Sequence, residues 1–107
     1  MESVVPSDFT GNNLGKSGDW VVCFGAEWCG FCRAFRPKFE KLEGQVKGTL
    51  AWADVSDSEN PLWESFHLEV IPTVVVFRGG AVHWRRDGKS MRGLSDGDIT
   101  DIKAATL

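Results

Sequence analysis

Two cysteines separated by two residues, Cys29 and Cys32, stand directly after a short apolar run. The run at residues 20–24 is rich in β-branched and aromatic side chains and is bounded by glycines, which predicts a buried strand. From residue 29 to residue 46 apolar side chains recur every three or four positions, which predicts a helix. Within that helix Pro37 predicts a kink, and a glycine after it predicts the stop. The cysteine pair therefore lies where a strand turns into a helix.

The remaining apolar runs predict strands and helices that alternate along the chain. Further strands are expected in four β-branched segments: residues 4–5, 50–55, 70–77 and 81–86. Further helices are expected in a weak segment near the start, after an Asn-Pro pair and after a capping serine: residues 7–14, 62–68 and 96–105. Gly79 and Gly80 separate the last two strands, which predicts an antiparallel hairpin. The order predicts one α/β domain over residues 1–107, with a central mixed sheet flanked by helices on both faces.

The charge balance and hydropathy exclude several classes of function. Lys and Arg number 12 against 15 Asp and Glu, and the net charge of −3 provides no basic excess for binding nucleic acid. No apolar run approaches the roughly 20 residues of a membrane helix. The first residues lack the basic start and the apolar stretch of a signal peptide. We therefore expect no nucleic-acid partner and no membrane association.

The spacing of Cys29 and Cys32 assigns each thiol a role. At the start of a helix, Cys29 faces unsatisfied backbone N–H groups and the positive end of the helix dipole, which stabilise a thiolate. We expect Cys29 to be the attacking nucleophile. Cys32 lies one turn further into the buried helix, and we expect it to be the slower thiol that resolves a mixed disulfide. Metal sites use the same spacing, but a strand, a small turn, the cysteine pair and a helix within a βαβ arrangement favour redox chemistry.

From about residue 19 to its last helix, the chain resembles the thioredoxin superfamily. The segment 26–32, Ala-Glu-Trp-Cys-Gly-Phe-Cys, is similar to the family's Ala-Glu-Trp-Cys-Gly-Pro-Cys segment. Pro37 matches the kinking proline of the family's active-site helix. Val-Ile-Pro-Thr at residues 70–73 resembles the family's cis-proline loop and is followed, as in the family, by a strand, a Gly-Gly turn and another strand.

This resemblance implies a thiol–disulfide oxidoreductase that exchanges disulfides with protein substrates and acts as a reductant. It implies that Pro72 is in the cis form and faces the cysteine pair, while the backbone of Ile71 pairs with an extended substrate segment. Trp28, Gly30 and Phe31 complete the expected substrate-binding surface. No cofactor and no metal is expected. The expected partners are protein disulfide substrates and an upstream reductase or oxidant, and we expect a monomer.

Two positions depart from the family pattern. Cys23 stands six residues before Cys29, where thioredoxins keep a buried acid that helps to move the proton of the resolving cysteine. A thiol in an apolar strand is a poor proton acceptor, so we expect water or a nearby acid such as Glu27 to replace it, or resolution to be slow. Cys23 is either a small buried apolar residue, the interpretation that we favour, or a third redox participant that pairs with Cys32. Phe31 stands where reductants carry Pro and isomerases carry His, and it offers neither positive charge nor ring rigidity.

Two alternative functions stay open at this stage. One is an isomerase or oxidase domain that works in an oxidising compartment. The other is a non-enzymatic binding module of the same fold, which holds partners in the groove at Ile71 and Pro72. The odd number of cysteines and the lack of a signal peptide favour the reducing cytoplasm. An extracytoplasmic origin is the alternative if a signal was removed.

Overall fold

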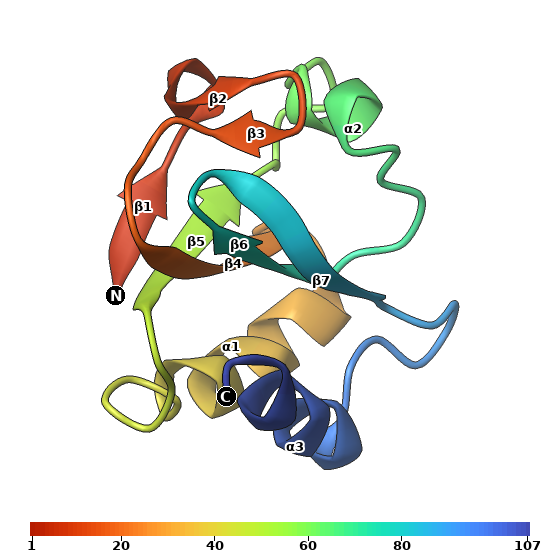
Figure 1. Cartoon of the computed structure of the whole chain (residues 1–107). Helices are drawn as coiled ribbons and strands as arrows, with labels where there is room; N and C mark the ends of the chain where they lie inside the picture. The colour runs from red at the N-terminus through yellow and green to blue at the C-terminus, as the bar shows by residue number, and fades with distance from the viewer.

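A five-stranded mixed sheet forms the centre of the computed structural model, which describes residues 1–107 (Figure 1). Its strands in chain order are β1 (Glu2–Val4), β4 (Asp19–Gly25), β5 (Thr49–Asp54), β6 (Thr73–Arg78) and β7 (Ala81–Asp87). Their spatial order is β1-β5-β4-β6-β7. Strands β1 and β4 run parallel to β5, whereas β6 is antiparallel to both β4 and β7. The central strand is therefore β4, the strand that leads into the cysteine pair.

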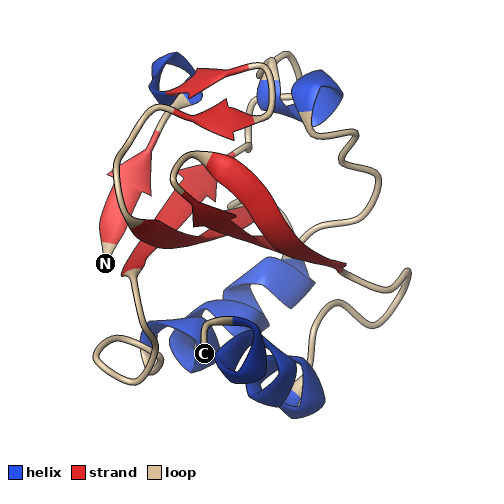
Figure 2. Ribbon diagram, in the orientation of Figure 1, coloured by secondary structure: helices blue, strands red, loops and turns tan.

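Helices cover both faces of this sheet, as Figure 2 shows. The α-helices are α1 (Gly30–Glu40), α2 (Leu62–Ser65) and α3 (Asp96–Ala105), and a short 3-10 helix, η1, spans Pro6–Asp8. Helices α1 and α3 pack side by side on one face, and α2 lies on the other with the hairpin of β2 (Phe9–Thr10) and β3 (Asn13–Leu14). This arrangement confirms the expected fold class. None of the helices combines the length and the apolar character needed to cross a membrane.

The core is one cluster of 27 buried residues that occupies both faces of the sheet. On one face, the rings of Phe9, Phe24, Phe66 and Phe77 contact one another with centroid distances of 4.9–6.2 Å. Trp52 lies on the face covered by α1 and packs against that helix. Side chains alternate between the two faces along a strand, so the neighbours of Phe24 in β4 face the opposite layer. Cys23 consequently points toward α1.

Residues 7–14 do not form the expected helix. The segment contains only the end of η1 and the β2–β3 hairpin, whose turn includes Gly11 at φ 59°. Phe9 and Leu14 pair across this hairpin, Leu14 is buried, and Phe9 packs against the core. An extended hairpin places both side chains against the sheet, and this tertiary packing outweighs a weak helical preference.

The main helix is shorter than its apolar pattern predicts. Helix α1 ends at Glu40, and residues 41–46 form turns in which Leu42 is still fully buried. Pro37 lies inside the last turn and has no N–H for the helical ladder. Gly44 follows at φ 79°, a conformation that ends helices.

Two other boundaries also differ from the expected ones. Helix α2 ends at Ser65, before His67 at φ 48°. Strand β6 begins at Thr73 because Pro72 has no N–H to donate to a sheet ladder. An edge strand exists near the N-terminus, but it lies at Glu2–Val4 instead of residues 4–5. The second strand, shifted by one residue, the Gly-Gly hairpin and the Ser95-capped last helix were predicted correctly.

Candidate active site

Strand β4 and helix α1 position the cysteine pair. The strand ends at Gly25 and the helix begins at Gly30, with Cys29 as its N-cap residue. The backbone N–H of Cys32 donates to Cys29 Sγ over 3.2 Å. A thiol here replaces the oxygen of an ordinary N-cap side chain, so the helix directs an otherwise unsatisfied N–H at the sulfur. The expected N-terminal placement of Cys29 is confirmed.

Cys29 and Cys32 differ in their access to solvent. Cys29 is 8% exposed, and Cys32 is 1% exposed. Burial raises the pKa of Cys32 to about 12, and its hydrogen bond with Cys29 adds to the increase. Cys32 therefore holds its proton at neutral pH. The more accessible sulfur is the one that receives the helical N–H, an asymmetry that agrees with the expected roles of nucleophile and resolving thiol.

The loop before β6 faces the cysteine pair, as expected. The Ile71-Pro72 peptide bond is cis, and the Cys29 thiol lies 3.7 Å from the carbonyl oxygen of Ile71, to which it donates. Pro72 itself is buried. The chain after β7 packs tightly against this loop, because a Cβ on Gly88 would lie 2.6 Å from the Pro72 carbonyl oxygen. The structure thus brings the two predicted motifs, the cysteine pair and the proline loop, into contact.

Three of the expected substrate-binding residues surround this contact on the surface. Trp28 is 61% exposed, Phe31 is 43% exposed, and Gly30 is also exposed. The backbone of Gly93 packs closely against Phe31, since a Cβ on Gly93 would lie 2.7 Å from the Phe31 Cβ. Exposed aromatic side chains next to an accessible thiol form a surface on which an extended polypeptide can lie. Their role in binding a substrate stays a prediction.

Two residues that hold Trp28 in place were not expected from the sequence. The indole N–H of Trp28 donates to the carbonyl oxygen of Ser56 over 2.8 Å, and the Ser56 hydroxyl accepts from the backbone N–H of Glu27 over 2.8 Å. Trp63 stacks on Trp28 with an interplanar angle of 8° and a centroid distance of 6.4 Å. The sequence contains one signal for this arrangement. Ser56 lies two residues after the end of β5, and the carboxyl ends of the neighbouring parallel strands β4 and β5 meet at one edge of the sheet.

Cys23 lies under the site and has no access to solvent. It is 0% exposed, and in the sheet it is the register neighbour of Trp52 in β5 and Val74 in β6. Burial, and then the nearby Cys32 thiol, raise the pKa of Cys23 well above its usual value. The structure therefore places Cys23 as a buried apolar residue, in agreement with the interpretation that we favour.

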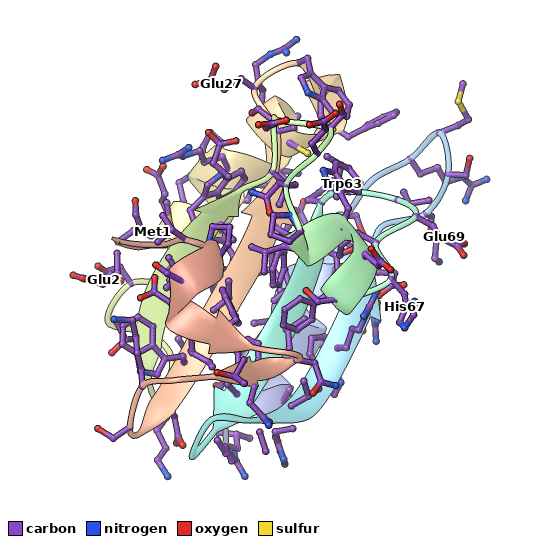
Figure 3. The ribbon with its side chains drawn as sticks, turned by 90° about the horizontal axis from the view of Figure 1, so that it is seen from above. Met1, Glu2, Glu27, Trp63, His67 and Glu69 are labelled. Carbon is purple, nitrogen blue, oxygen red and sulfur yellow. The ribbon has the colours of Figure 1, made fainter.

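Glu27 lies at the surface, and its carboxylate points away from the molecule (Figure 3). Its backbone carbonyl oxygen accepts a hydrogen bond from Arg33 over 2.7 Å. The expected substitute for the family's buried acid is thus near the cysteine pair in the sequence but is oriented toward solvent.

A cavity of about 150 Å³ opens beside Cys32, on the side away from the proline loop. Its lining contains an apolar floor, two guanidinium groups and two acids: Ala26, Glu27, Cys32, Arg33, Arg36, Trp52 and Asp54. The guanidinium of Arg36 lies 4.6 Å from the Trp52 ring centroid, and its Nε donates to Glu40 over 3.0 Å. Cys32, the buried resolving residue, is therefore part of the wall of this cavity. Asp54, the last residue of β5, was not expected at the site.

No group of three or more metal-ligating side chains is arranged to hold a metal ion. The three cysteines are free thiols. Cys29 and Cys32 thus place two free thiols next to each other at this site.

Comparison with known proteins identifies this arrangement. The family model for thioredoxin matches residues 2–97. The thioredoxin of Rhodospirillum rubrum is 34% identical over 83 residues, which cover 77% of this chain and 80% of that protein. A protein disulfide-isomerase A6 homolog of Drosophila melanogaster is 33% identical over 75 residues, which cover 69% of this chain and 17% of that protein.

Solved structures show the same fold. Thioredoxin f2 of Chlamydomonas reinhardtii superimposes with a TM-score of 0.76 over 97% of this chain and 94% of that one, at 19% identity. This likeness concerns the fold alone. The chain spans less than half the length of several curated relatives that it matches, which are longer proteins with thioredoxin-like regions. The match to the family model covers most of the chain, and the chain belongs to the thioredoxin family.

Proposed function

We propose that this protein is a thiol–disulfide oxidoreductase that reduces disulfides in protein substrates through Cys29 and Cys32. The observation that carries the proposal is the position of Cys29 Sγ. It accepts the N–H of Cys32 at the start of α1 and lies 3.7 Å from the Ile71 carbonyl oxygen, beside the cis bond to Pro72. One face of this sulfur is thus polarised by the helix, and the other is next to the backbone that an extended substrate would meet.

The reaction proceeds in two exchanges. The Cys29 thiolate attacks one sulfur of the substrate disulfide, a mixed disulfide forms, and the other substrate sulfur leaves as a thiolate that takes up a proton. Cys32 then loses its proton and attacks Cys29 Sγ, which releases the second substrate thiol and leaves a Cys29–Cys32 disulfide. The substrate disulfide gains two electrons and the dithiol loses them. An upstream reductase, the proposed second partner, restores the dithiol.

The direction of electron flow separates this proposal from an isomerase or oxidase. The relatives include proteins named thioredoxin and proteins named protein disulfide-isomerase. The Ala-Glu-Trp sequence before Cys29, Ile71 before Pro72, and Arg33 after the motif support the reductant. The odd number of cysteines, which leaves Cys23 without a partner beside the Cys29–Cys32 pair, supports a reducing compartment such as the cytoplasm. We also propose that the protein acts as a monomer.

Insulin reduction tests the catalytic proposal. Wild-type protein should accelerate the precipitation of insulin by dithiothreitol, and Cys29→Ser should remove the acceleration. The rival proposal, a binding module without catalysis, predicts no difference between wild type, Cys29→Ser and dithiothreitol alone.

Equilibration with defined glutathione ratios tests the direction. Trp28 lies next to the cysteine pair, so its fluorescence should report the fraction of Cys29–Cys32 disulfide. A reductant should have a potential near −270 mV, whereas an isomerase should have one near −180 mV, roughly 4 kcal/mol apart for two electrons. A value at the isomerase end would exclude the proposed direction and leave the exchange chemistry intact.

A further inference from the structure

The second exchange needs a proton acceptor for Cys32, and the buried residues near this thiol do not supply one. Cys32 is 1% exposed and has a pKa raised to about 12 by burial and by its hydrogen bond with Cys29. Cys23, beneath it, is 0% exposed and holds its own proton. The cavity that Cys32 lines therefore offers a route for this proton.

The charged groups around that cavity come from each element that packs against Cys32. Helix α1 contributes Arg33 and Arg36, the loop before the helix contributes Glu27, and β5 contributes Asp54. The two guanidinium groups are donors only and cannot accept a proton. Glu27 is turned to solvent (Figure 3). Asp54 is exposed as well, but its carboxylate is held in place by hydrogen bonds from Ser56 at the cavity wall.

The position of Asp54 is set by the sheet and by Ser56. Asp54 is the register neighbour of Gly25, so the end of β5 lies beside the end of the strand that leads into the cysteine pair. Its Oδ1 accepts the backbone N–H of Ser56 over 2.8 Å and also accepts the Ser56 hydroxyl. No protein donor is recorded for its Oδ2, which leaves that oxygen available to accept a proton.

We propose that Asp54 is the proton-accepting residue for resolution and acts on Cys32 through water in the cavity. The volume of about 150 Å³ is enough for more than one water molecule, and the walls offer the polar partners that such water needs. During attack on Cys29 Sγ, the Cys32 proton passes to water and from water to the Asp54 carboxylate, which later releases it to solvent. This inference rests on the proposed function and names the residue that replaces the family's buried acid.

Asp54→Asn tests the proposal because it removes the base and keeps the geometry. The amide oxygen of Asn can still accept from the Ser56 N–H and hydroxyl, so the loop that holds Trp28 stays in place. The substrate is an aromatic disulfide that releases a coloured thiolate twice, first on attack by Cys29 and then on resolution by Cys32. Stopped-flow absorbance separates the two phases.

We expect the second phase at pH 7 to slow about tenfold, below the 10²–10⁴-fold that direct general bases supply, because water relays the proton. The deficit should shrink as the pH rises toward 10, where hydroxide replaces the carboxylate as the base. The first phase should not change. Asp54→Glu, which keeps the carboxylate, should recover part of the rate.

The sign of the effect separates proton transfer from simple electrostatics. Loss of a negative charge near Cys32 favours its thiolate, so a purely electrostatic Asp54 predicts faster resolution in Asp54→Asn. Asp57→Asn is the matched control, since it removes one charge from the same segment, keeps an equivalent turn hydrogen bond to Glu59, and lies outside the cavity lining. Its resolution rate should stay within twofold of wild type.

Several results would overturn the proposal. One is a second phase that is unchanged or faster in Asp54→Asn. Another is a second phase that slows as much in Asp57→Asn as in Asp54→Asn, or a first phase that slows as much as the second in Asp54→Asn. The last is a second phase that is slowed by Glu27→Gln and not by Asp54→Asn. A wild-type protein that fails to reduce insulin would refute the proposed function, a result separate from all of these. Urea unfolding of each variant excludes a loss of structure as the cause.

Discussion

Replacement of Cys23 by aspartate should destabilise the protein in a pH-dependent way. Cys23 is 0% exposed, lies between Trp52 and Val74 in the sheet, and its only hydrogen-bond contact is the Phe24 carbonyl oxygen at 4.0 Å. A carboxyl group in that site must either stay protonated with few partners or ionise without water. An unpaired buried polar group costs about 1–3 kcal/mol. We therefore expect Cys23→Asp to lower the free energy of unfolding by about 2–3 kcal/mol at pH 7.

The sign of the pH dependence follows from the burial. Desolvation raises the pKa of the introduced carboxyl in the folded state above its value of about 3.9 in the unfolded chain. Between those two values the folded state binds more protons, so stability decreases as pH rises, by up to about 1.4 kcal/mol per pH unit. The deficit of Cys23→Asp should therefore be larger at pH 8 than at pH 5.

Urea unfolding of wild type, Cys23→Asp and Cys23→Ala from pH 5 to pH 8 measures both effects. Cys23→Ala creates a small cavity and should cost about 1 kcal/mol at every pH in this range. A deficit in Cys23→Asp that is absent, or that grows toward acidic pH, would refute the assignment of position 23 to an apolar, solvent-free environment. Resolution should also be faster in Cys23→Asp, most clearly when Asp54 is replaced by Asn. A large rate loss in Cys23→Ala would instead make the third cysteine part of the redox cycle.

Three further predictions concern the site and its support. Cys29→Ser should abolish turnover, while Cys32→Ser should accumulate mixed disulfides with its targets on non-reducing gels; trapping by Cys29→Ser alone would reverse the roles. Phe31→Pro should make the protein more reducing and Phe31→His more oxidising against glutathione, and a shift in one direction for both would contradict tuning by this side chain. Asp98→Asn should cost about 1 kcal/mol at pH 7 in urea unfolding, because the amide can still accept the Ser95 N–H but loses the negative charge that pairs with Arg86 over 2.7 Å and lies at the positive end of α3. Burial opposes the ionisation of Asp98, but hydrogen bonds from the Ser95 N–H and the Arg86 guanidinium lower its pKa. The stabilisation by the Asp98 carboxylate is therefore present above about pH 4 and is lost as the pH falls through the lowered pKa. A deficit in Asp98→Asn that stays constant down to acidic pH would contradict this prediction.

The local signals in the sequence predicted the parts of the fold that depend on neighbouring residues. A run of β-branched residues forms a strand wherever it is buried, so the strand that leads into the cysteine pair was predicted correctly. Gly79 and Gly80 both have positive φ, 57° and 86°, as the tight hairpin requires. Ser95 has the capping box that acids three residues later can complete.

Helix ends were less predictable because apolar spacing does not distinguish a helix from buried turns. Leu42 continues the apolar pattern of α1 and is fully buried, yet it lies beyond the end of the helix at Glu40. The hairpin at Phe9 and Leu14 depends on contacts with the sheet that only the folded chain provides. The sequence therefore showed which side chains would be buried more reliably than the backbone that would bury them.

The residues of the candidate site also fall into two groups, those that the sequence predicted and those that it did not. Cys29 and Cys32 could be predicted because their spacing at the start of a helix carries the chemistry. Pro72 was predicted through the resemblance of residues 70–73 to the family's proline loop. Trp63, Ser56 and Asp54 belong to no motif. Asp54 and Ser56 reach the site because β4 and β5 are parallel and adjacent, a pairing that follows from the topology rather than from neighbouring residues. Trp63 reaches it from α2, where its indole N–H donates to the carbonyl oxygens of Val55 and Asp57.

The pairing of β4 with β5 allows an acid at the end of β5 to replace an acid at the centre of β4 as the proton acceptor for Cys32. An acid at position 23 would lie next to Cys32 inside the sheet, where burial opposes the ionisation of its carboxyl group. Asp54, at the end of the adjacent strand, lines the same cavity as Cys32 and is held there by Ser56, and the proposed water in that cavity would link the two residues. The ionised form of Asp54 costs little in stability, but proton transfer then depends on water. A chain with Cys23 in the sheet can therefore keep an apolar, more stable core, and we expect its resolution step to be sensitive to the size and polarity of the cavity rather than to the interior of the strand.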